Sequence, residues 1–513
     1  MKSEERLSRI IATIVEQKCL RTLLTFNGSQ ILNDSQLLGL NRLRVLRVDS
    51  EAMDSIPGSL GDLIHLRYLN LDGTNIRELP ESIGRLTNLQ FLNLRSCVYL
   101  TKLPNSITQL HNLRRLGLYN TPLSYFPKGI AKLEKLNDLS GFVVADDHQM
   151  EQSGLKELNS LPLLRMLSIS KLERAQKGDL SLEKLTHLVN VKLLYSEEII
   201  NTEEAEIDRI EDVLEELRPP QFLQHLHIRN FSGRRYPSWM KSPSFGSCLP
   251  NLVKLELSDA TLCERLPPAG ELPQLKHLDI DGALSVKTIG SEFVGLGVMR
   301  TAFPKLETFN LGGMENLEEW SFEEVASDQQ RFVLLPRLDE LTLEGCPKLA
   351  ALPKGLAQSA IKKLLIEGAY KLIEVENLPN LTELVLMGNL FLKRISSLPQ
   401  LQFLVVNTCP LLDCVEKMQA LQRLDLFDVY MEVLPPWLPI LLQERKPVDD
   451  EDDDFLFQLY CSEKVLWRCL KGGPDWSIIE QIPRVYASDD TGKGFLRYTK
   501  QPFSYFTNMY VVD

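Results

Sequence analysis

A leucine phrase recurs along most of this 513-residue chain and limits its possible folds more than any other feature. Copies of Leu-x-x-Leu-x-Leu begin at Leu66, Leu89 and Leu113, so that consecutive copies start 23 and 24 residues apart. No catalytic role of a side chain explains such a period. A unit made of one strand and a return segment cannot bury its own apolar face, so units of this kind must stack. The pattern therefore predicts a stacked-repeat solenoid and favours a binding surface over an active site.

The spacing and wording of the phrase are those of a leucine-rich repeat. We expect an α/β fold in which a curved parallel β-sheet forms the concave face. Helical, 3-10 and loop returns should form the convex face, and a small α/β module should close the C-terminal end. Proline follows an apolar residue in several returns, as in Leu79-Pro80 and Leu103-Pro104. A proline there ends strand pairing because it removes a backbone donor.

Changes in regularity predict the organisation of the chain. Residues 203–217 read as a charged amphipathic helix, which we interpret as a large convex return, with a partner-binding helix as the alternative. The tail predicts a helix around 456–470 followed by short strands. The expected segments are an amphipathic N-terminal helix or linker at 1–19, regular repeats at 20–145, irregular repeats at 146–222, a second repeat block at 223–445, an acidic loop at 446–454 and a C-terminal capping module at 455–513.

Charge and hydropathy restrict the class of partner. The formal net charge is −12, which argues against nucleic acid and anionic membranes, since both attract positive charge. The sequence contains no run of about 18 apolar residues, so no membrane span is predicted. The first residues, MKSEERLSRII, do not form a secretory signal. Nine dispersed cysteines without a Cys-x-x-Cys pair fit a reducing cytoplasm.

The side chains between the strand leucines should point outward on the concave face, because alternate residues of a strand face opposite sides. Early repeats place aromatic residues and arginine there, a composition that is favoured at binding hot spots. The last repeats place an apolar strip there, which either binds a partner or is covered by the C-terminal module. The candidate partner-binding residues are Tyr68, Phe91, Arg95, Arg115, Tyr119, Leu365, Val385, Met387, Phe403, Val405 and Phe427.

Motifs for chemistry are weak, so no enzyme, metal site or cofactor site is predicted. The segment Thr491-Gly492-Lys493-Gly494 fails the spacing of a phosphate-binding loop. His225 and His227 share one predicted strand, and His277 lies two strands further along, too distant for a common metal. The residues 455–513 show no acid, base and nucleophile cluster.

Longer phrases resemble one family. LRYLNLDGTNIRELPESIGRLTNLQFLNLRSC at 66–97 is similar to the repeat region of plant intracellular nucleotide-binding leucine-rich-repeat immune receptors of the coiled-coil type. EDVLEELRPPQFLQHLHIRNFSGRRYPSWM at 211–240 and AFPKLETFNLGGMENLEEW at 302–320 resemble the same family. The tail phrases GGPDWSIIEQIPRVYA and YTKQPFSYFTN look like the C-terminal end of its cereal members. The resemblance covers nearly the whole chain.

The resemblance implies pathogen recognition and autoinhibition through protein–protein binding on the concave face. The implied partners are a pathogen effector or a host protein, and a nucleotide-binding switch domain in cis or in trans. ADP or ATP would belong to that switch domain, which these residues lack, so no cofactor is expected in this chain. The alternative is a free-standing adaptor or scaffold, such as a ubiquitin-ligase substrate receptor. An extracellular receptor fragment is a third reading, disfavoured by the absence of a secretion signal.

Overall fold

The computed structural model describes residues 20–26, 34, 37, 39–145, 154–197, 203–295, 301–322, 333–445 and 454–509. The predicted N-terminal helix at 1–19 lies outside these residues, as does the acidic segment apart from Asp454. The chain divides into two compact units. Unit 1 comprises Met1–Trp239 with Cys248–Leu252, and unit 2 comprises Met240–Ser247 with Val253–Asp513. Each unit is described by itself.

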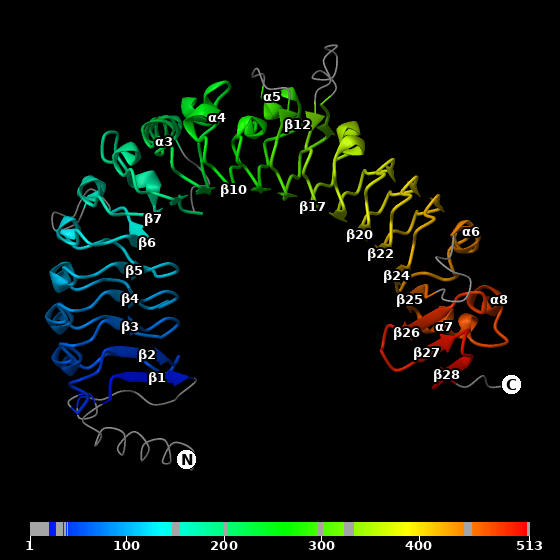
Figure 1. Cartoon of the computed structure of the whole chain (residues 1–513), viewed down its shortest axis with the longest axis horizontal. Helices are drawn as coiled ribbons and strands as arrows, with labels where there is room; N and C mark the ends of the chain where they lie inside the picture. Colours follow the sequence, from blue (N-terminus) through cyan, green and yellow to red (C-terminus); the bar gives the residue numbers. More distant parts are fainter. Residues whose placement is uncertain are drawn as a thin grey trace. The chain divides into compact units, whose positions relative to one another are not determined.

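In unit 1, consecutive repeats contribute parallel neighbouring strands (Figure 1). Each strand pairs with the strand of the next repeat, so sequence order is also spatial order. The strands are β1 (Thr22–Phe26), β2 (Val45–Asp49), β3 (Tyr68–Asn70), β4 (Phe91–Asn93), β5 (Arg115–Gly117), β6 (Asp138–Val143), β7 (Met166–Ser170), β8 (Asn190–Leu194) and β9 (His225–Arg229).

The recurring leucines form the core between strands and returns. The middle strand leucines Leu69, Leu92 and Leu116 are 0% exposed and pair in register along β3, β4 and β5. The leucines that open the repeats, such as Leu66 and Leu89, are also 0% exposed. This burial confirms the solenoid predicted from the leucine period, because each repeat covers the apolar side of its neighbours.

Short 3-10 helices form the returns of unit 1. The prolines Pro57, Pro80 and Pro104 occupy the N-cap positions of the first three, each in an extended conformation. Hydrogen bonds join successive returns: the Glu81 carboxylate accepts from the backbone N–H groups of Asn105 and Ser106. The returns are η1 (Gly58–Asp62), η2 (Glu81–Arg85), η3 (Asn105–Gln109), η4 (Ile130–Lys132), η5 (Leu155–Ser160), η6 (Leu172–Arg174) and η7 (Leu182–Lys184).

The charged segment predicted as a helix is α3 (Glu204–Glu216). Its apolar stripe, which includes Ile207, Ile210 and Leu214, is buried. The Leu214 carbonyl accepts a hydrogen bond from the Trp239 indole N–H at 3.2 Å. Because unit 1 buries this stripe itself, α3 serves as the large return between β8 and β9 rather than offering its apolar side to a partner. The short η8 (Ser238–Met240) follows β9.

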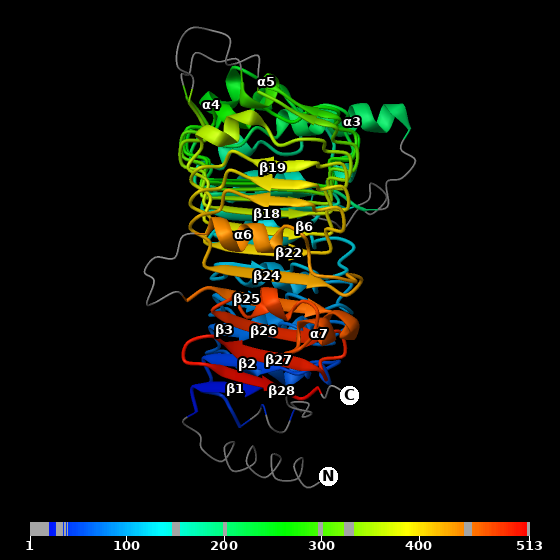
Figure 2. The same cartoon turned by 90° about the vertical axis from the view of Figure 1, so that its right-hand side faces the viewer.

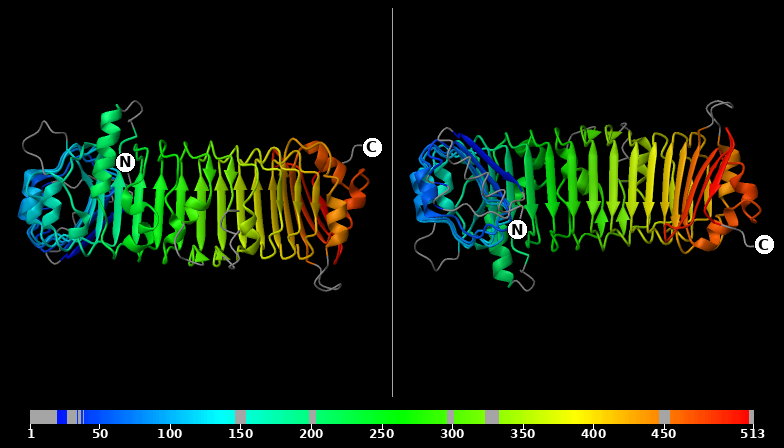
Figure 3. Two further views of the ribbon diagram at one scale, coloured as in Figure 1. Left: turned by 90° about the horizontal axis from the view of Figure 1, so that it is seen from above. Right: turned by 90° about the horizontal axis from the view of Figure 1, so that it is seen from below.

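Unit 2 repeats the parallel arrangement (Figure 3). Its central strands each have an alternating burial pattern, as expected for a sheet with one buried face. They are β10 (Lys254–Ser258), β11 (His277–Asp281), β14 (Thr308–Gly312), β17 (Glu340–Glu344), β18 (Lys363–Glu367), β20 (Glu383–Met387), β22 (Phe403–Asn407) and β24 (Arg423–Asp428).

The returns of unit 2 change character as the repeats shorten. Earlier returns contain short helices, two-residue strands or both, whereas each 20-residue repeat after β18 has one three-residue strand in its return. The returns comprise α4 (Ser244–Cys248), η9 (Ala269–Glu271), β12 (Thr288–Ile289), α5 (Ser291–Val294), β13 (Thr301–Ala302), β15 (Glu319–Trp320), β16 (Val333–Leu334), η11 (Lys354–Gln358), β19 (Glu374–Glu376), β21 (Arg394–Ser396), β23 (Cys414–Glu416) and α6 (Leu438–Glu444). The strands β19, β21 and β23 form a second parallel sheet. A 20-residue repeat therefore retains backbone pairing on both sides.

Polar side chains bond backbone in the turns that follow several strands. The sequence predicts that Cys97, Cys346 and Cys409 bond turn backbone, and the thiol of Cys97 donates to the Leu71 carbonyl at 3.1 Å. The thiols of Cys346 and Cys409 approach backbone carbonyls at 3.9 and 3.6 Å. Burial raises the pKa of Cys346 to about 12, so this thiol stays protonated and can donate. At the equivalent position, Asn389 bonds two backbone groups.

The C-terminal module differs from its sequence prediction at its start. We expected a helix around 456–470, but Leu456–Cys461 forms the strand β25, and α7 spans only Glu463–Cys469. Burial alternates along β25, with Phe457 and Leu459 inside, so the period is that of a strand. The module continues with α8 (Trp476–Ile479), β26 (Arg484–Asp489), β27 (Phe495–Thr499) and β28 (Ser504–Thr507). β25 and β26 extend the parallel sheet, and β27 and β28 add antiparallel strands (Figure 2).

Candidate binding surface

The outward residues of the parallel strands form one face of the sheet in each unit. We call it the open face, and it is the face predicted to be concave. Its side chains alternate with the buried leucines and lie opposite the returns. All eleven candidate residues are half-buried or exposed. The structure brings some of them together and separates others.

Tyr68 and Phe91 form a stacked pair on the open face of unit 1. They lie opposite each other in register on β3 and β4, with ring centroids 4.5 Å apart and planes 9° from parallel. Arg115 follows on β5, opposite Phe91. An asparagine pair supports this arrangement, since Asn93 donates to the side-chain oxygen of Asn70 at 3.2 Å. The stack thus places two aromatic side chains side by side on the open face, a composition that is favoured at binding hot spots.

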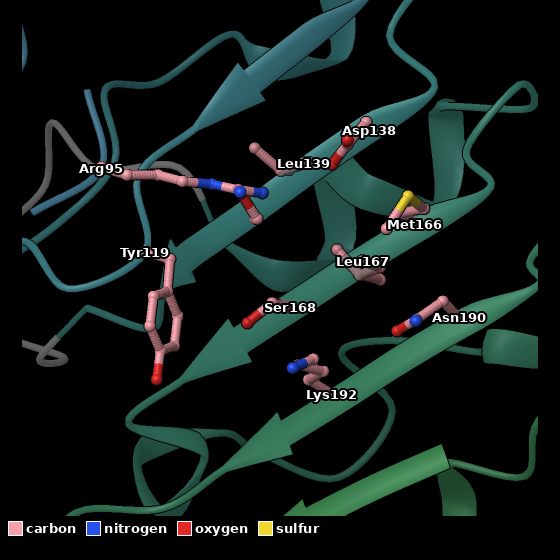
Figure 4. A pocket seen from close by; sticks show the side chains of 10 residues that line it. Arg95, Tyr119, Asp138, Leu139, Met166, Leu167, Ser168, Asn190 and Lys192 are labelled. Carbon is pink, nitrogen blue, oxygen red and sulfur yellow. The ribbon is translucent and has the colours of Figure 1, made fainter. Parts of the chain in front are cut away.

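Arg95 and Tyr119 line a hollow on the open face further along unit 1. The hollow has a volume of about 270 Å³ and lies over β6, β7 and β8 (Figure 4). Its lining also includes Asp138 and Met166, the latter 41% exposed. The remaining lining residues are Leu139, Ser140, Leu167, Ser168, Asn190 and Lys192.

A backbone irregularity marks the place of the hollow. The pairing of β6 with β7 shifts register between Ser140 and Phe142. Gly141, with φ +93°, stands where the repeat phrase has its last leucine, and a Cβ there would lie 2.6 Å from the Leu118 carbonyl carbon. This missing leucine is the one sequence signal that could have directed attention to the hollow. Sequence reasoning did not select Asp138, Met166, Ser168, Asn190 or Lys192.

The hollow contains polar atoms without a partner among the described residues. The Oδ1 atom of Asp138 and the Oγ atom of Ser168 are both buried and accept or donate no hydrogen bond there. Ser168 is only 4% exposed. Burial raises the pKa of Asp138, and the positive charges of Arg95 and Arg115 oppose that shift. Unpaired buried polar atoms cost free energy, which a ligand could recover by bonding them.

The apolar strip predicted in unit 2 is partly continuous. Leu365, Val385 and Val405 lie side by side in register on β18, β20 and β22. Their row ends at Asp425 on β24. Met387 lies in the adjacent row between Glu367 and Asn407. The continuous apolar part of the strip thus consists of three aliphatic residues.

Phe403 and Phe427 have other neighbours. The Arg423 guanidinium lies 4.9 Å from the Phe403 ring centroid and forms a two-point ion pair with the buried Asp425. Phe427 faces Tyr460 of β25, with ring centroids 6.2 Å apart. These two phenylalanines therefore flank the row rather than lengthening it. The described part of the C-terminal module extends the sheet beyond β24 and does not lie across the row.

Two sequence features with possible chemistry have structural roles. His277 lies 2.9 Å from the Thr308 hydroxyl, and His225 lies 3.4 Å from the Asn190 amide. Among the described residues, no group of histidine, cysteine and acidic side chains could hold a metal ion. Thr491–Gly494 forms the turn between β26 and β27, where Asp489 accepts from the backbone N–H groups of Lys493 and Gly494.

Comparison with known proteins adds a family and named relatives. The family model described as "Leucine-rich repeat region" matches residues 19–384. RGA4 of Solanum bulbocastanum, named among disease resistance proteins, is 36% identical over 369 residues, which are 70% of this chain and 35% of that protein. Disease resistance protein RGA2 of the same plant is 37% identical over 60% of this chain and 31% of its own length. The chain thus spans about a third of the length of these relatives.

Solved structures show a distant likeness. A Leptospira interrogans leucine-rich-repeat protein, LIC12759, aligns over 85% of this chain and 97% of its own, with a TM-score of 0.40 and 18% identity. At this level the likeness does not bear on function. Within the described residues, no helix is both long and apolar enough to cross a membrane.

Proposed function

Since this chain belongs to the leucine-rich repeat region family, we propose that it is the recognition and autoinhibitory region of a plant intracellular immune receptor. Its open face would bind a pathogen effector or a modified host protein. In the resting state, the same face would hold a nucleotide-binding switch domain closed. ADP or ATP would bind to that domain, and the chain would act in the cytoplasm. This chain would contribute binding, not catalysis.

The observation that carries the proposal is the aliphatic row on the open face of unit 2. Leu365, Val385 and Val405 are half-buried neighbours on three parallel strands, and no described segment of unit 2 lies across them (Figure 2). We take this row as the centre of the interaction site, because contiguous apolar groups on the surface of soluble proteins are often functional. The relatives named as disease resistance proteins support an immune role for that interaction.

Signalling requires that the two states bind differently. A partner shifts an equilibrium only by its differential affinity for the two conformations. If the switch domain and the effector compete for one face, effector binding removes the contact that keeps the receptor closed. The mechanism therefore predicts that the switch domain and the effector compete for the open face.

The experiment uses a double variant in the aliphatic row. Val385→Asp with Val405→Asp places two carboxylates side by side on the open face without touching the buried leucines. We expect normal circular dichroism and loss of binding to a purified nucleotide-binding domain from a related disease resistance protein. The variant Phe403→Asp with Val405→Asp should also lose binding. It is less specific as a test, because it removes the contact between Arg423 and Phe403 as well.

The matched control is Ile373→Asp, which adds a carboxylate at a residue that is 52% exposed and lies outside the strands of the open face. It should bind as the wild-type chain does. Undiminished binding by a folded Val385→Asp, Val405→Asp variant would refute the proposed role of the row. If the control and the double variant lost binding equally, the aliphatic row would not be the binding site.

A further inference from the structure

A row of exposed arginines runs along one end of the strands of unit 1. The residues that directly precede β1 to β7 are held in register by backbone hydrogen bonds. The Arg44 N–H donates to the Arg21 carbonyl and the Arg67 N–H donates to the Arg44 carbonyl, each at 2.8 Å. In spatial order (Figure 1), the seven residues are Arg21, Arg44, Arg67, Gln90, Arg114, Asn137 and Arg165. All five arginines are exposed, and we call them the arginine row.

This arrangement costs free energy in the free chain. Neighbouring strands of a sheet lie about 4.8 Å apart, so the whole row spans about 29 Å. The strand spacing is shorter than the screening length of about 8 Å at physiological ionic strength. Like charges on directly opposite residues of neighbouring strands destabilise a sheet, and Arg21, Arg44 and Arg67 stand on three consecutive strands. Within the described part of the chain, no carboxylate forms an ion pair with any member of the row.

Neighbouring positions do not neutralise the row. The first residues of β1 to β7 include one acid, Asp138, and one further cation, Arg115. The residues two positions before the members of the row include the cations Arg42 and Lys135 and, in the sequence, no acid. The chain as a whole nevertheless has a formal net charge of −12. A concentrated positive row on an acidic protein favours an anionic ligand, whose charges would remove the repulsion between the arginines.

The chemistry of the row favours carboxylates on a protein over a nucleic acid. All five cations are arginines, whose planar guanidinium groups bind a carboxylate through two parallel hydrogen bonds. A nucleic acid strand is negatively charged along its whole length, so the parts beyond the row would meet an acidic protein. An acidic segment of a protein can present its charges to the row alone. We propose that the arginine row binds an acidic segment of a protein partner, with carboxylates bonded to successive guanidinium groups.

This inference rests on the proposed function for the role of the chain in binding a protein partner. It deepens that function by giving the charge of the partner segment that meets unit 1. The arginine row and the aliphatic row are different sites, in unit 1 and unit 2, and are tested separately. The test of the arginine row uses no nucleotide-binding domain. Failure of the pull-down with the Val385 and Val405 variant would therefore leave its outcome unaffected, and the reverse also holds.

The experiment measures binding of a fluorescently labelled peptide of eight glutamates to the full chain by fluorescence anisotropy. A peptide of eight lysines and a single DNA strand of eight thymidines are the comparison probes. The row variant combines Arg44→Gln, Arg67→Gln and Arg114→Gln. The matched control removes the same charge from exposed arginines of unit 1 that lie outside the row, and it combines Arg77→Gln, Arg85→Gln and Arg235→Gln.

We expect the glutamate peptide to bind the wild-type chain and the control alike. It should bind the row variant about eightfold more weakly, because each exposed ion pair contributes roughly a factor of two in affinity. Raising the salt concentration from about 50 to 200 mM should weaken binding to the wild-type chain more than binding to the row variant. The thymidine strand should bind more weakly than the glutamate peptide, and the lysine peptide should not bind. The melting temperature of the row variant should equal or exceed that of the wild-type chain, since fewer like charges are held together.

Four results would overturn the proposal. Equal losses of affinity in the row variant and the control would assign the binding to overall charge. Tighter binding of the thymidine strand would assign the row to nucleic acid. A lower melting temperature of the row variant would show that the arginines stabilise the fold. No binding of the glutamate peptide at about 5 mM, above the range expected for a flexible peptide held by surface ion pairs, would show that the row does not bind an acidic segment.

Discussion

Replacing Leu92 by alanine tests the physical basis of the fold. Leu92 is 0% exposed, and its partners in register, Leu69 and Leu116, are 0% exposed as well. A leucine enclosed in this way leaves a cavity that its neighbours cannot fill, because they are held by their own repeats. Leucine-to-alanine changes at such sites cost about 3 to 5 kcal/mol. Because the cavity stays open, we expect a loss of at least about 3 kcal/mol.

The loss should be local, since each repeat contacts mainly its neighbours. Hydrogen exchange of the backbone amides in β3, β4 and β5 measures the free energy of local opening directly. A loss of about 3 kcal/mol corresponds to exchange faster by roughly a hundredfold, at 1.36 kcal/mol for each factor of ten. Amides of β20 and β22 in unit 2 should keep their wild-type rates.

Arg115→Ala is the matched control. Arg115 is exposed on β5, one strand from Leu92, and points to the open face. Its loss should change the local free energy by less than about 0.5 kcal/mol, as is usual for surface substitutions. Leu92→Asp should be more damaging than Leu92→Ala, because an unpaired carboxylate would be buried. Wild-type exchange rates in Leu92→Ala would refute the assigned inward direction of the strand leucines.

The remaining predictions concern Asn389 in a turn of unit 2, Gly141 in β6 and Asp489 in the C-terminal module. Asn389→Ala should destabilise unit 2 by on the order of 3 kcal/mol in urea denaturation, because the backbone groups of Ala369 and Ile366 lose their partner. Gly141→Ala should lower the stability more than Gly388→Ala. Both glycines have a positive φ, but only a Cβ at position 141 would clash with backbone atoms. Thermal melting of the two variants measures the difference. Burial acts to raise the pKa of Asp489, but donors from Gly494, Thr491 and Lys493 outweigh it and lower the pKa. The stabilisation from Asp489 should therefore be present above about pH 4 and be lost as the pH falls through the lowered pKa of Asp489 in the folded protein. Hydrogen-exchange protection of the turn should then differ between wild type and Asp489→Ala at pH 6 and become equal in acid.

Much of the fold follows from local pattern. The leucine period predicts the strands around Leu69, Leu92 and Leu116, and the amphipathic stripe predicts α3. The predicted helix around 456–470 is wrong at Leu456–Cys461, which forms the alternating strand β25. An apolar run of that length fits both periods, and only pairing with β24 decides between them.

The candidate site was less predictable, because outward direction does not specify neighbours. Alternation correctly placed Phe403 and Phe427 outside the core, but their strip is interrupted. Arg423 covers Phe403, and Phe427 turns to Tyr460 of the C-terminal module. Such contacts depend on side chains from strands that are 20 or more residues away in sequence, so a pattern along one strand does not reveal them.

By itself, the sequence determined the repeat, the inward leucines and the turn positions of Cys97, Cys346 and Cys409, because a short period acts through neighbours along the chain. Tertiary structure alone decided where the open face is hollow. In-register pairing of β6, β7 and β8 places Asp138, Met166 and Asn190 in one row and Ser140, Ser168 and Lys192 in another, and these rows line the hollow. Backbone pairing between repeats sets that alignment, and it joins residues that lie more than 20 positions apart in the sequence.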